Sequence, residues 1–239
     1  QRFDDTTGGL HWQLGKGGGF HFFESETLGQ TLPVAILMGG PPSLMLSSIA
    51  PLPENIFELS LASLIQGSKI RVVEKEGFPY LIPAEADFAL LGHAKPHERR
   101  MEGPFGDHFG YISQSHPFPI FKCTELLHRK DAIYPATVVG KPPQEDMYIG
   151  QALQSVFAPL IRLTMPSIKE LYTYPEVGFH ALASTIINER YEKESLCTAF
   201  RILGESQLSL TKVLLVFQES LPLHQSQLFL PYMLERLRF

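Results

Sequence analysis

Two carboxylic acids stand close together in the stretch 101–111, which reads MEGPFGDHFGY. Glu102 and Asp107 are separated by two glycines, a proline and a phenylalanine. A stiff loop that holds two carboxyl groups together can raise the pKa of one acid, so that it donates a proton, while the other acid stays ionised. Gly-Asp sequences are also typical of solvated turns, so the pattern alone favours an ordinary turn with both acids in water.

A glycine run could carry a second kind of chemistry. The stretch 10–23 reads LHWQLGKGGGFHFF, in which three consecutive glycines follow Lys16. Such glycines let the backbone approach a ligand closely and direct N–H groups at an anion, to which the lysine adds charge. The run matches neither a dinucleotide-binding motif nor a P-loop, because the following FHFFES does not predict a helix. From the pattern alone we favour a glycine-rich hairpin connection.

Metal ligation is a third candidate chemistry. His11 and Glu58 are suitable ligands, but nothing in their spacing selects them from 9 histidines and 25 acids. The cluster of His93, His97 and His108 matches no zinc spacing. The pattern therefore leaves the metal question open.

The type of secondary structure that the sequence predicts around these residues changes near residue 145. Before it, short β-type runs are separated by Gly and Pro, a pattern that predicts a barrel or a sandwich. The expected strands are 33–40, 68–74, 80–94, 117–128 and 132–140. Helices are expected at 42–50 and 53–67. After it, helices at 147–166 and 191–205 and strands at 181–190 and 211–219 predict α/β alternation. The sequence thus predicts an α+β protein with domains 1–145 and 146–239.

Composition excludes several classes of function. The 239 residues carry a formal net charge of -5 without a basic stripe, so no nucleic-acid partner is expected. The apolar runs are too short for a transmembrane segment and the start lacks a signal peptide, which favours a cytoplasmic protein, with peripheral membrane association left open. The first residue is Gln1, and 226–239 reads as a helix with an apolar face. We therefore expect the native protein to continue beyond both ends.

Four long stretches together resemble one family. TTGGLHWQLGKGGGFH, MGGPPSLMLSSIAPLPENIFE, RRMEGPFGDHFGYISQSHPFPIF and AIYPATVVGKPPQEDMYIGQAL occur in this order. They resemble the UbiD-type decarboxylases, and the similarity covers essentially the whole chain. The resemblance implies a split β-barrel domain, like that of flavin reductases, followed by part of an α/β domain. It also implies reversible, non-oxidative decarboxylation of an aromatic or α,β-unsaturated acid, with a quinone precursor such as 4-hydroxy-3-polyprenylbenzoate as the favoured substrate.

The resemblance implies cofactors and the residues that hold them. Members of the family use prenylated FMN, whose phosphate is bridged to the protein by a divalent ion, usually Mn2+, beside a monovalent ion such as K+. His11 and Glu58 resemble the family's ligands for the divalent metal. The cofactor-contacting positions correspond to His11, Trp12, Gln13, Lys16 and Gly17. The segment beside the monovalent ion corresponds to Ser47, Ser48 and Ala50.

The family's acid pair corresponds to Glu102 and Asp107. After carbon dioxide leaves, a carboxylic acid of the protein protonates the substrate carbon, and we assign this step to Glu102 with Asp107 as the coupled acid; the two roles could be exchanged. In relatives, a metal-binding Asn and a catalytic Arg lie in a segment that would end at Gln1, and Arg2 does not align with that Arg. We therefore expect the chain as given to lack full activity, together with the family's N-terminal domain and C-terminal tail.

The resemblance also implies partners. A flavin prenyltransferase would supply the cofactor, and the full-length protein would form a homo-oligomer, either a dimer or a hexamer. Two other functions stay open from sequence. One is a non-catalytic scaffold or assembly subunit of the same fold. The other is a plain FMN-dependent reductase, although the EGPFGD stretch argues against a reductase.

Overall fold

The computed structural model describes residues 1–12, 17–50, 52, 56–106, 110–138, 140–141, 143–179 and 181–236. The chain divides into two compact units. Unit 1 comprises Gln1–Gly106 and Ile112–Val138, and unit 2 comprises Asp107–Tyr111 and Val139–Phe239. Each unit is described by itself.

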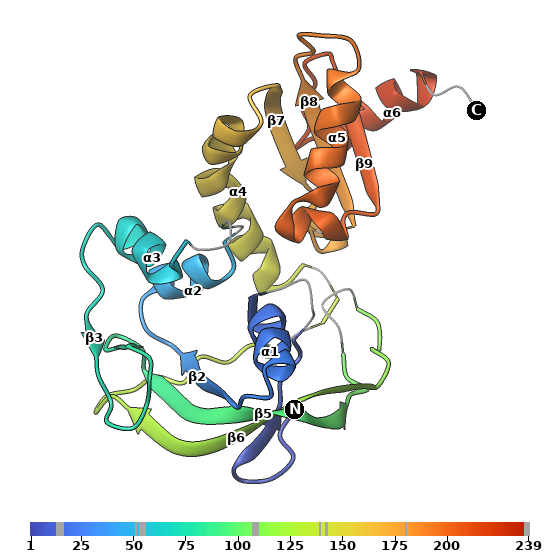
Figure 1. Ribbon diagram of the computed structural model, residues 1–239. Coiled ribbons are helices and arrows are strands. Elements are labelled where there is room, and N and C mark those ends of the chain that lie inside the picture. Colours follow the sequence, from blue (N-terminus) through green and yellow to red (C-terminus); the bar gives the residue numbers. More distant parts are fainter. Residues whose placement is uncertain are drawn as a thin grey trace. The chain divides into compact units, whose positions relative to one another are not determined.

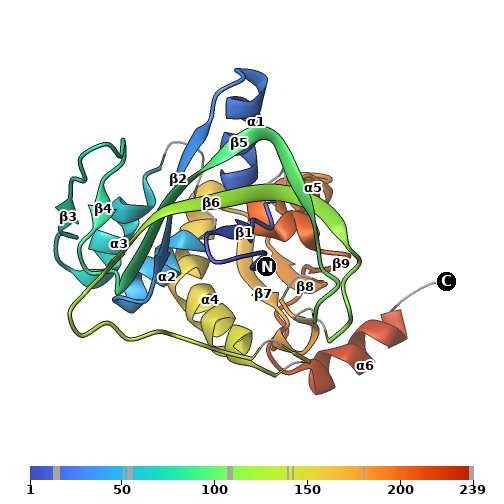
Figure 2. The same cartoon turned by 90° about the horizontal axis from the view of Figure 1, so that it is seen from below.

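An antiparallel sheet forms the frame of unit 1 (Figures 1 and 2). Its strands are β1 (Thr7–Gly9), β2 (Leu32–Met38), β5 (Phe88–Glu102) and β6 (His116–His128), in the order β1-β6-β5-β2. A separate small ladder pairs β3 (Val72–Val73) with β4 (Ile82–Pro83). Among the described residues this sheet is open, with β1 and β2 as its edges. The mixed α+β class agrees with the prediction, whereas closure into a split barrel stays a prediction.

Three helices accompany this sheet, namely α1 (Gly17–Thr27), α2 (Pro42–Ser48) and α3 (Glu58–Gln66). The prediction of a hairpin at the glycine run was wrong, because α1 begins within it, at Gly17. Phe22 of α1 is buried against Val34, Ala94 and Phe121 of the sheet. This packing supplies the helix stability that the weak propensity of glycine and phenylalanine does not.

Ion pairing joins the end of α1 to an irregular part of β5. Ala94 pairs with Phe121 and Arg99 with Pro119, so four residues of β5 bulge outward opposite one residue of β6. Arg99 donates to both carboxylate oxygens of Glu26, over 2.7 and 2.8 Å, and the backbone N–H of His97 donates to Glu26 over 2.8 Å. These bonds hold the pKa of Glu26 down at about 2, the hydrogen bond from Arg99 being the largest cause. We call this group the α1 clasp.

Several predicted boundaries in unit 1 were wrong. The expected strand 132–140 is absent from the described part, 132–138, where Tyr134 and Val138 are 65% and 90% exposed and Pro135 cannot donate to a ladder. The expected strand 80–94 contains β4, but the long strand starts at Phe88 and continues to Glu102. Only Val72–Val73 of 68–74 pair, and α3 begins at Glu58 rather than near residue 53.

Unit 2 is built on a mixed sheet in the order β7-β8-β9. Its strands are β7 (Ile168–Thr173), β8 (Leu182–Ile187) and β9 (Val213–Phe217), and its helices are α4 (Glu145–Thr164), α5 (Glu194–Gly204) and α6 (Ser226–Arg236), with short turns η1 (Pro175–Val177) and η2 (Ser206–Leu210). β8 and β9 run parallel and α5 connects them, as the predicted α/β alternation requires. The antiparallel strand β7 was not predicted. Met165, Ile168 and Ile202 form the core beneath α5.

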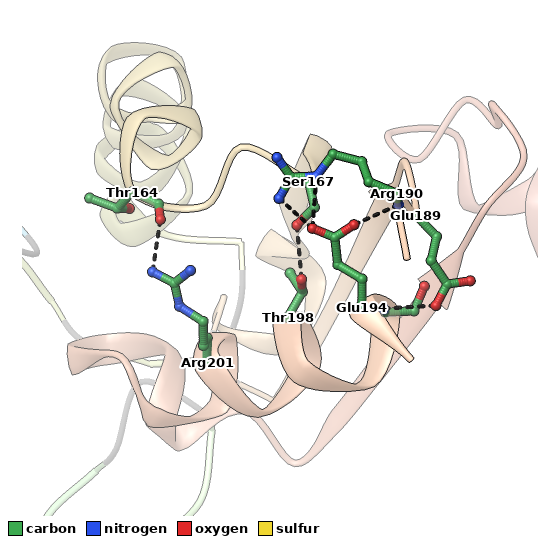
Figure 3. A network of polar contacts seen from close by, with 8 residues as sticks. Thr164, Ser167, Glu189, Arg190, Glu194, Thr198 and Arg201 are labelled. Atoms are coloured by element: carbon green, nitrogen blue, oxygen red, sulfur yellow. Dashed lines mark hydrogen bonds and ion pairs between the residues drawn. The ribbon is translucent and has the colours of Figure 1, made fainter. Parts of the chain in front are cut away.

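A polar network surrounds the start of α5 in unit 2 (Figure 3). Glu194 is 2% exposed, and Arg190 donates to its Oε1 through Nε, over 2.9 Å, and to its Oε2 through the backbone N–H, over 2.6 Å. Ser167 and Thr198 share a buried hydrogen bond of 2.8 Å. A search of the described helices found none that is both long and apolar enough to cross a bilayer.

Candidate active site

The sheet of unit 1 brings His11 and Glu102 together across 91 residues of sequence. Glu102 is the last residue of β5 and lies opposite His116 of β6. β1 flanks the other edge of β6, and Leu10 donates its backbone N–H to Pro119 of β6, so the chain after β1 still follows that strand. As a result His11 Nδ1 lies 3.0 Å from Glu102 Oε1.

Glu102 is not a solvated turn residue. The residue is 2% exposed, and its Oε2 has no hydrogen-bond partner in the part of the chain that the structure describes. A buried carboxyl oxygen without a partner is costly in a purely structural role, which makes such an atom a candidate for contact with a ligand. The turn interpretation of 101–111 was therefore wrong for Glu102.

A cavity of about 760 Å³ lies beside α1, β2, α2 and α3 in unit 1. Trp12, Gly18, Ser47, Ser48 and Glu58 line it, together with apolar side chains that include Leu37, Leu44, Met45, Phe57 and Leu81. A Cβ on Gly18 would meet the Trp12 indole at 2.6 Å, whereas one on Gly17 would meet nothing within 4 Å. The close approach therefore depends on Gly18, which was not singled out from sequence, rather than on Gly17. The cavity is large enough for a cofactor-sized molecule.

The residues predicted to bind ions are partly gathered at this cavity. Ser47 and Ser48 end α2, and each hydroxyl donates to a carbonyl three residues earlier, which leaves lone pairs on both oxygens. Glu58 lies exposed in the first turn of α3. Ala50 follows α2, and its N–H donates to the Ser47 carbonyl. Across the described ranges, no three or more His, Cys, Asp or Glu side chains gather as a metal site.

Some predicted site residues cannot be placed. Gln13, Lys16 and Asp107 lie outside the described residues. The predicted pairing of Glu102 with Asp107 and the contact of Lys16 with a phosphate therefore stay predictions.

Two further residues of the site were not predicted. A Cβ on Gly9 would lie 2.5 Å from Glu102 Oε2, so the glycine leaves the space in which this oxygen sits. Phe118 stacks on the His11 ring, with 4.2 Å between centroids. Only the pairing of β1 with β6 reveals these neighbours, and no local sequence signal marks them.

Comparison with known proteins identifies the family of the chain. Residues 1–142 match the family model described as the 3-octaprenyl-4-hydroxybenzoate carboxy-lyase Rift-related domain, and residues 147–239 match the C-terminal domain of the same carboxy-lyase. The chain belongs to the UbiD family. An uncharacterized protein of Chlamydia trachomatis is 54% identical over 242 residues, which cover 100% of this chain and 42% of the relative. A protein of Chlamydia pneumoniae, named as a subunit of a 4-hydroxybenzoate decarboxylase, is 52% identical over 238 residues, covering 100% and 41%. The chain thus spans less than half the length of these UbiD relatives.

Solved UbiD-class structures share the fold. The enzyme HmfF from Pelotomaculum thermopropionicum, in an evolved dimeric form with prFMN, superposes with a TM-score of 0.80 at 22% identity, over 99% of this chain and 54% of that one. The vanillic acid decarboxylase of Sedimentibacter hydroxybenzoicus gives a TM-score of 0.81 at 23% identity, over 90% and 46%. At these identities the likeness is one of fold.

Proposed function

We propose that this UbiD-family chain forms part of a decarboxylase that removes carbon dioxide from an aromatic or α,β-unsaturated acid with the help of prenylated FMN. One observation carries the proposal: a buried glutamate, Glu102, has one oxygen held by His11 and the other without a partner among the described residues. This arrangement suits a group that contacts a ligand, because the second oxygen is buried without a partner among the described residues.

The described residues fit a flavin cofactor. The cavity is lined by an aromatic side chain, Trp12, which packs against the backbone of Gly18, and by apolar side chains of β2, α2 and α3. When bound, prenylated FMN would accept the electron pair left on the substrate as carbon dioxide departs. Trp12, Gly17 and Gly18 would hold the cofactor, with His11, Gln13 and Lys16 as the further candidates implied by the resemblance.

The ions are a finer part of the proposal. His11 and Glu58 would supply ligands of Mn2+, and the oxygens near Ser47, Ser48 and Ala50 would border K+. The described residues do not form a complete divalent site by themselves.

Glu102 would perform the protein's chemical step. In its protonated form it would give its proton to the substrate carbon, and burial would exclude the water that could otherwise compete as a proton source. Asp107 would then return a proton to Glu102. A quinone precursor such as 4-hydroxy-3-polyprenylbenzoate is the substrate we favour, in a cytoplasmic homo-oligomer whose cofactor comes from a flavin prenyltransferase.

The test uses the full-length protein, produced together with a flavin prenyltransferase. Carbon dioxide release is measured with 4-hydroxybenzoate, a 4-hydroxy-3-prenylbenzoate and vanillate. We expect release from at least one acid, and its loss in Glu102→Gln while the bound flavin spectrum is retained. Turnover that survives in Glu102→Gln would remove this residue from the chemistry. A flavin-loaded protein that releases no carbon dioxide from any of the acids would favour a scaffold.

A further inference from the structure

We infer that Asp87 is a positioning residue for the proposed cofactor cavity. Its carboxylate fixes the turn between β2 and α2, and this turn sets where α2 presents Ser47 and Ser48 to the cavity. The inference rests on the proposed function, which places these two serines beside a monovalent ion near the flavin. It comes from the contacts between one buried carboxylate and two glycines.

The turn between β2 and α2 is tight and left-handed. It contains Gly39 and Gly40, at φ 73° and 91°, which only glycine adopts without strain. A Cβ on Gly39 would overlap Asp87 Oδ2, and one on Gly40 would lie 2.7 Å from the carbonyl oxygen of Glu85. The turn therefore packs directly against the segment that leads into β5.

The carboxylate of Asp87 holds this turn through one hydrogen bond. The backbone N–H of Gly40 donates to Asp87 Oδ2 over 2.7 Å. Asp87 is buried, and a charged acceptor at this distance makes a strong bond to a backbone donor. The other oxygen, Oδ1, lies 3.7 Å from Nη1 of Arg129, whose side chain is 54% exposed. That ion pair is long and screened by solvent, so the bond to Gly40 is the stronger of the two.

The strand register explains why Asp87 reaches the turn. Phe88 pairs with Met38 of β2 on one side and with His128 of β6 on the other. The residue before Phe88 therefore stands at the end of three adjacent strands, and its carbonyl accepts the N–H of Arg129 over 3.0 Å. An aspartate at this position ties the start of α2 to the sheet.

Helix α2 is too short to fix its own direction. It contains 7 residues, and its N-cap residue is Pro41, whose side chain can neither donate nor accept a cap bond. Ser43 Oγ donates to Gln66 Oε1 over 2.9 Å, which joins α2 to α3 rather than to the sheet. The turn held by the carboxylate therefore decides how Ser47 and Ser48, which line the cavity, are placed against β2.

The first experiment compares Asp87→Ala, Asp87→Asn and Arg129→Ala in the full-length protein. Asn keeps an oxygen that can accept from the Gly40 N–H, and Arg129→Ala removes only the ion pair. Each apoprotein is titrated with FMN in the presence of MnCl2 and KCl, and flavin fluorescence gives the Kd. We expect the Kd for FMN and the half-saturating KCl concentration to rise about 10-fold or more in Asp87→Ala. Both should stay within about threefold in the other two variants.

The asparagine variant separates positioning through an acceptor from a general loss of charge. A Kd in Asp87→Asn as high as in Asp87→Ala would overturn the inference. Equal losses in Asp87→Ala and Arg129→Ala, or no loss in Asp87→Ala, would overturn it as well.

The second experiment tests the same contact from the glycine side. Gly39→Ala and Gly77→Ala both place a Cβ at positive φ, 73° and 78°, but the Cβ at position 77 would meet nothing within 4 Å. The Gly77 variant thus measures the effect of backbone strain alone. We expect the Kd for FMN to rise about 10-fold in Gly39→Ala and to stay within about threefold in Gly77→Ala. Equal effects of the two substitutions would contradict the role of the turn.

A third measurement needs no flavin. The melting temperatures of Asp87→Ala, Gly39→Ala and the double variant form a cycle. Removal of the carboxylate relieves the overlap that a Cβ at position 39 creates, so the double variant should lose less than the sum of the two single losses. Additive losses would overturn the inference, whether or not the protein is a decarboxylase.

The wild type separates this inference from the proposed function. A wild type with a coupled pair that binds FMN but releases no carbon dioxide from 4-hydroxybenzoate, a 4-hydroxy-3-prenylbenzoate or vanillate would count against the proposed function alone. A wild type that binds no FMN would overturn both.

Discussion

Glu102 in unit 1 and Glu194 in unit 2 are equally buried, each at 2% exposure, but their oxygens are satisfied differently. Arg190 bonds both oxygens of Glu194, through its guanidinium and its backbone N–H, and these bonds lower the pKa of Glu194. Glu102 has one histidine on Oε1, and no described residue bonds Oε2. Burial alone therefore does not distinguish these two glutamates, whereas the bonding of the second oxygen does.

The comparison predicts opposite phenotypes for the two glutamine variants. Glu102→Gln should lower kcat by about 1000-fold in the full-length enzyme, because the amide cannot donate a carboxylic proton. Its melting temperature should change little, since the amide retains an oxygen that can accept from His11. Carbon dioxide release and thermal melting measure the two effects. A large loss of stability with modest loss of kcat would place Glu102 in the same class as Glu194.

A third acid, Glu58 at the cavity, extends the comparison of Glu102 with Glu194. Glu58→Ala should reduce the affinity for manganese about 10- to 100-fold and weaken flavin binding, because it removes a proposed ligand. Glu24→Ala is the matched control, since Glu24 also lines the cavity but is not a proposed ligand. Elemental analysis and flavin absorbance of the purified full-length variants report the outcome. Equal metal content in both variants would remove Glu58 from the ion site.

Glu194→Gln should affect stability and leave kcat unchanged. The amide loses the charge that Arg190 pairs with, and we expect the melting temperature to fall by roughly 2–6 °C. The lowered pKa of Glu194 means that its contribution is present above the ordinary value of 4.5 and is lost as pH falls through the folded-state pKa. Thermal melting between pH 7 and pH 3 checks both parts. A normal melting temperature combined with reduced kcat would reverse the assignment.

The smallest effect is expected at the α1 clasp. The pKa of Glu26 falls from 4.5 to about 2, so the stability it contributes is complete above pH 4.5 and is lost as pH falls toward 2. Arg99 is 35% exposed, so solvent screens its ion pair with Glu26. We therefore expect Glu26 to contribute about 1–2 kcal/mol to the free energy of unfolding. Glu26→Gln should lower the melting temperature at pH 7 by about 2–4 °C and flatten its fall between pH 4.5 and 2. An unchanged pH dependence would show that the clasp contributes nothing.

The sequence predicted segments whose periodicity matched their packing. The helix α5 and the strands β8 and β9 lie within the ranges expected from their patterns, and the helix α4 begins two residues before its expected range. Prediction from sequence failed where contacts between residues that are distant in the sequence decide the structure. Gly17 begins a helix because Phe22 packs on the sheet, and the run at 132–138 forms no strand although it contains Ile133 and Val138.

The candidate site was predictable only by resemblance. Glu102 could be named from EGPFGD, but its burial follows from being the last residue of β5 rather than part of a turn. His11 could be named as a ligand, but its bond to Glu102 depends on the register β1-β6-β5. Gly9 has no local signal, because the atom it accommodates belongs to a residue on another strand.

The bulge of β5 lies between two parts of the proposed site. Its four residues end at Glu98; the next residue, Arg99, pairs with Glu26 on α1, and three residues later the strand reaches Glu102. At about 3.3 Å per residue, the segment from Arg99 to Glu102 is about 10 Å long. Helix α1 also supplies Gly18 and His21 to the cavity wall. The ion pair between Arg99 and Glu26 therefore connects the strand that ends in Glu102 to the helix that lines the cavity.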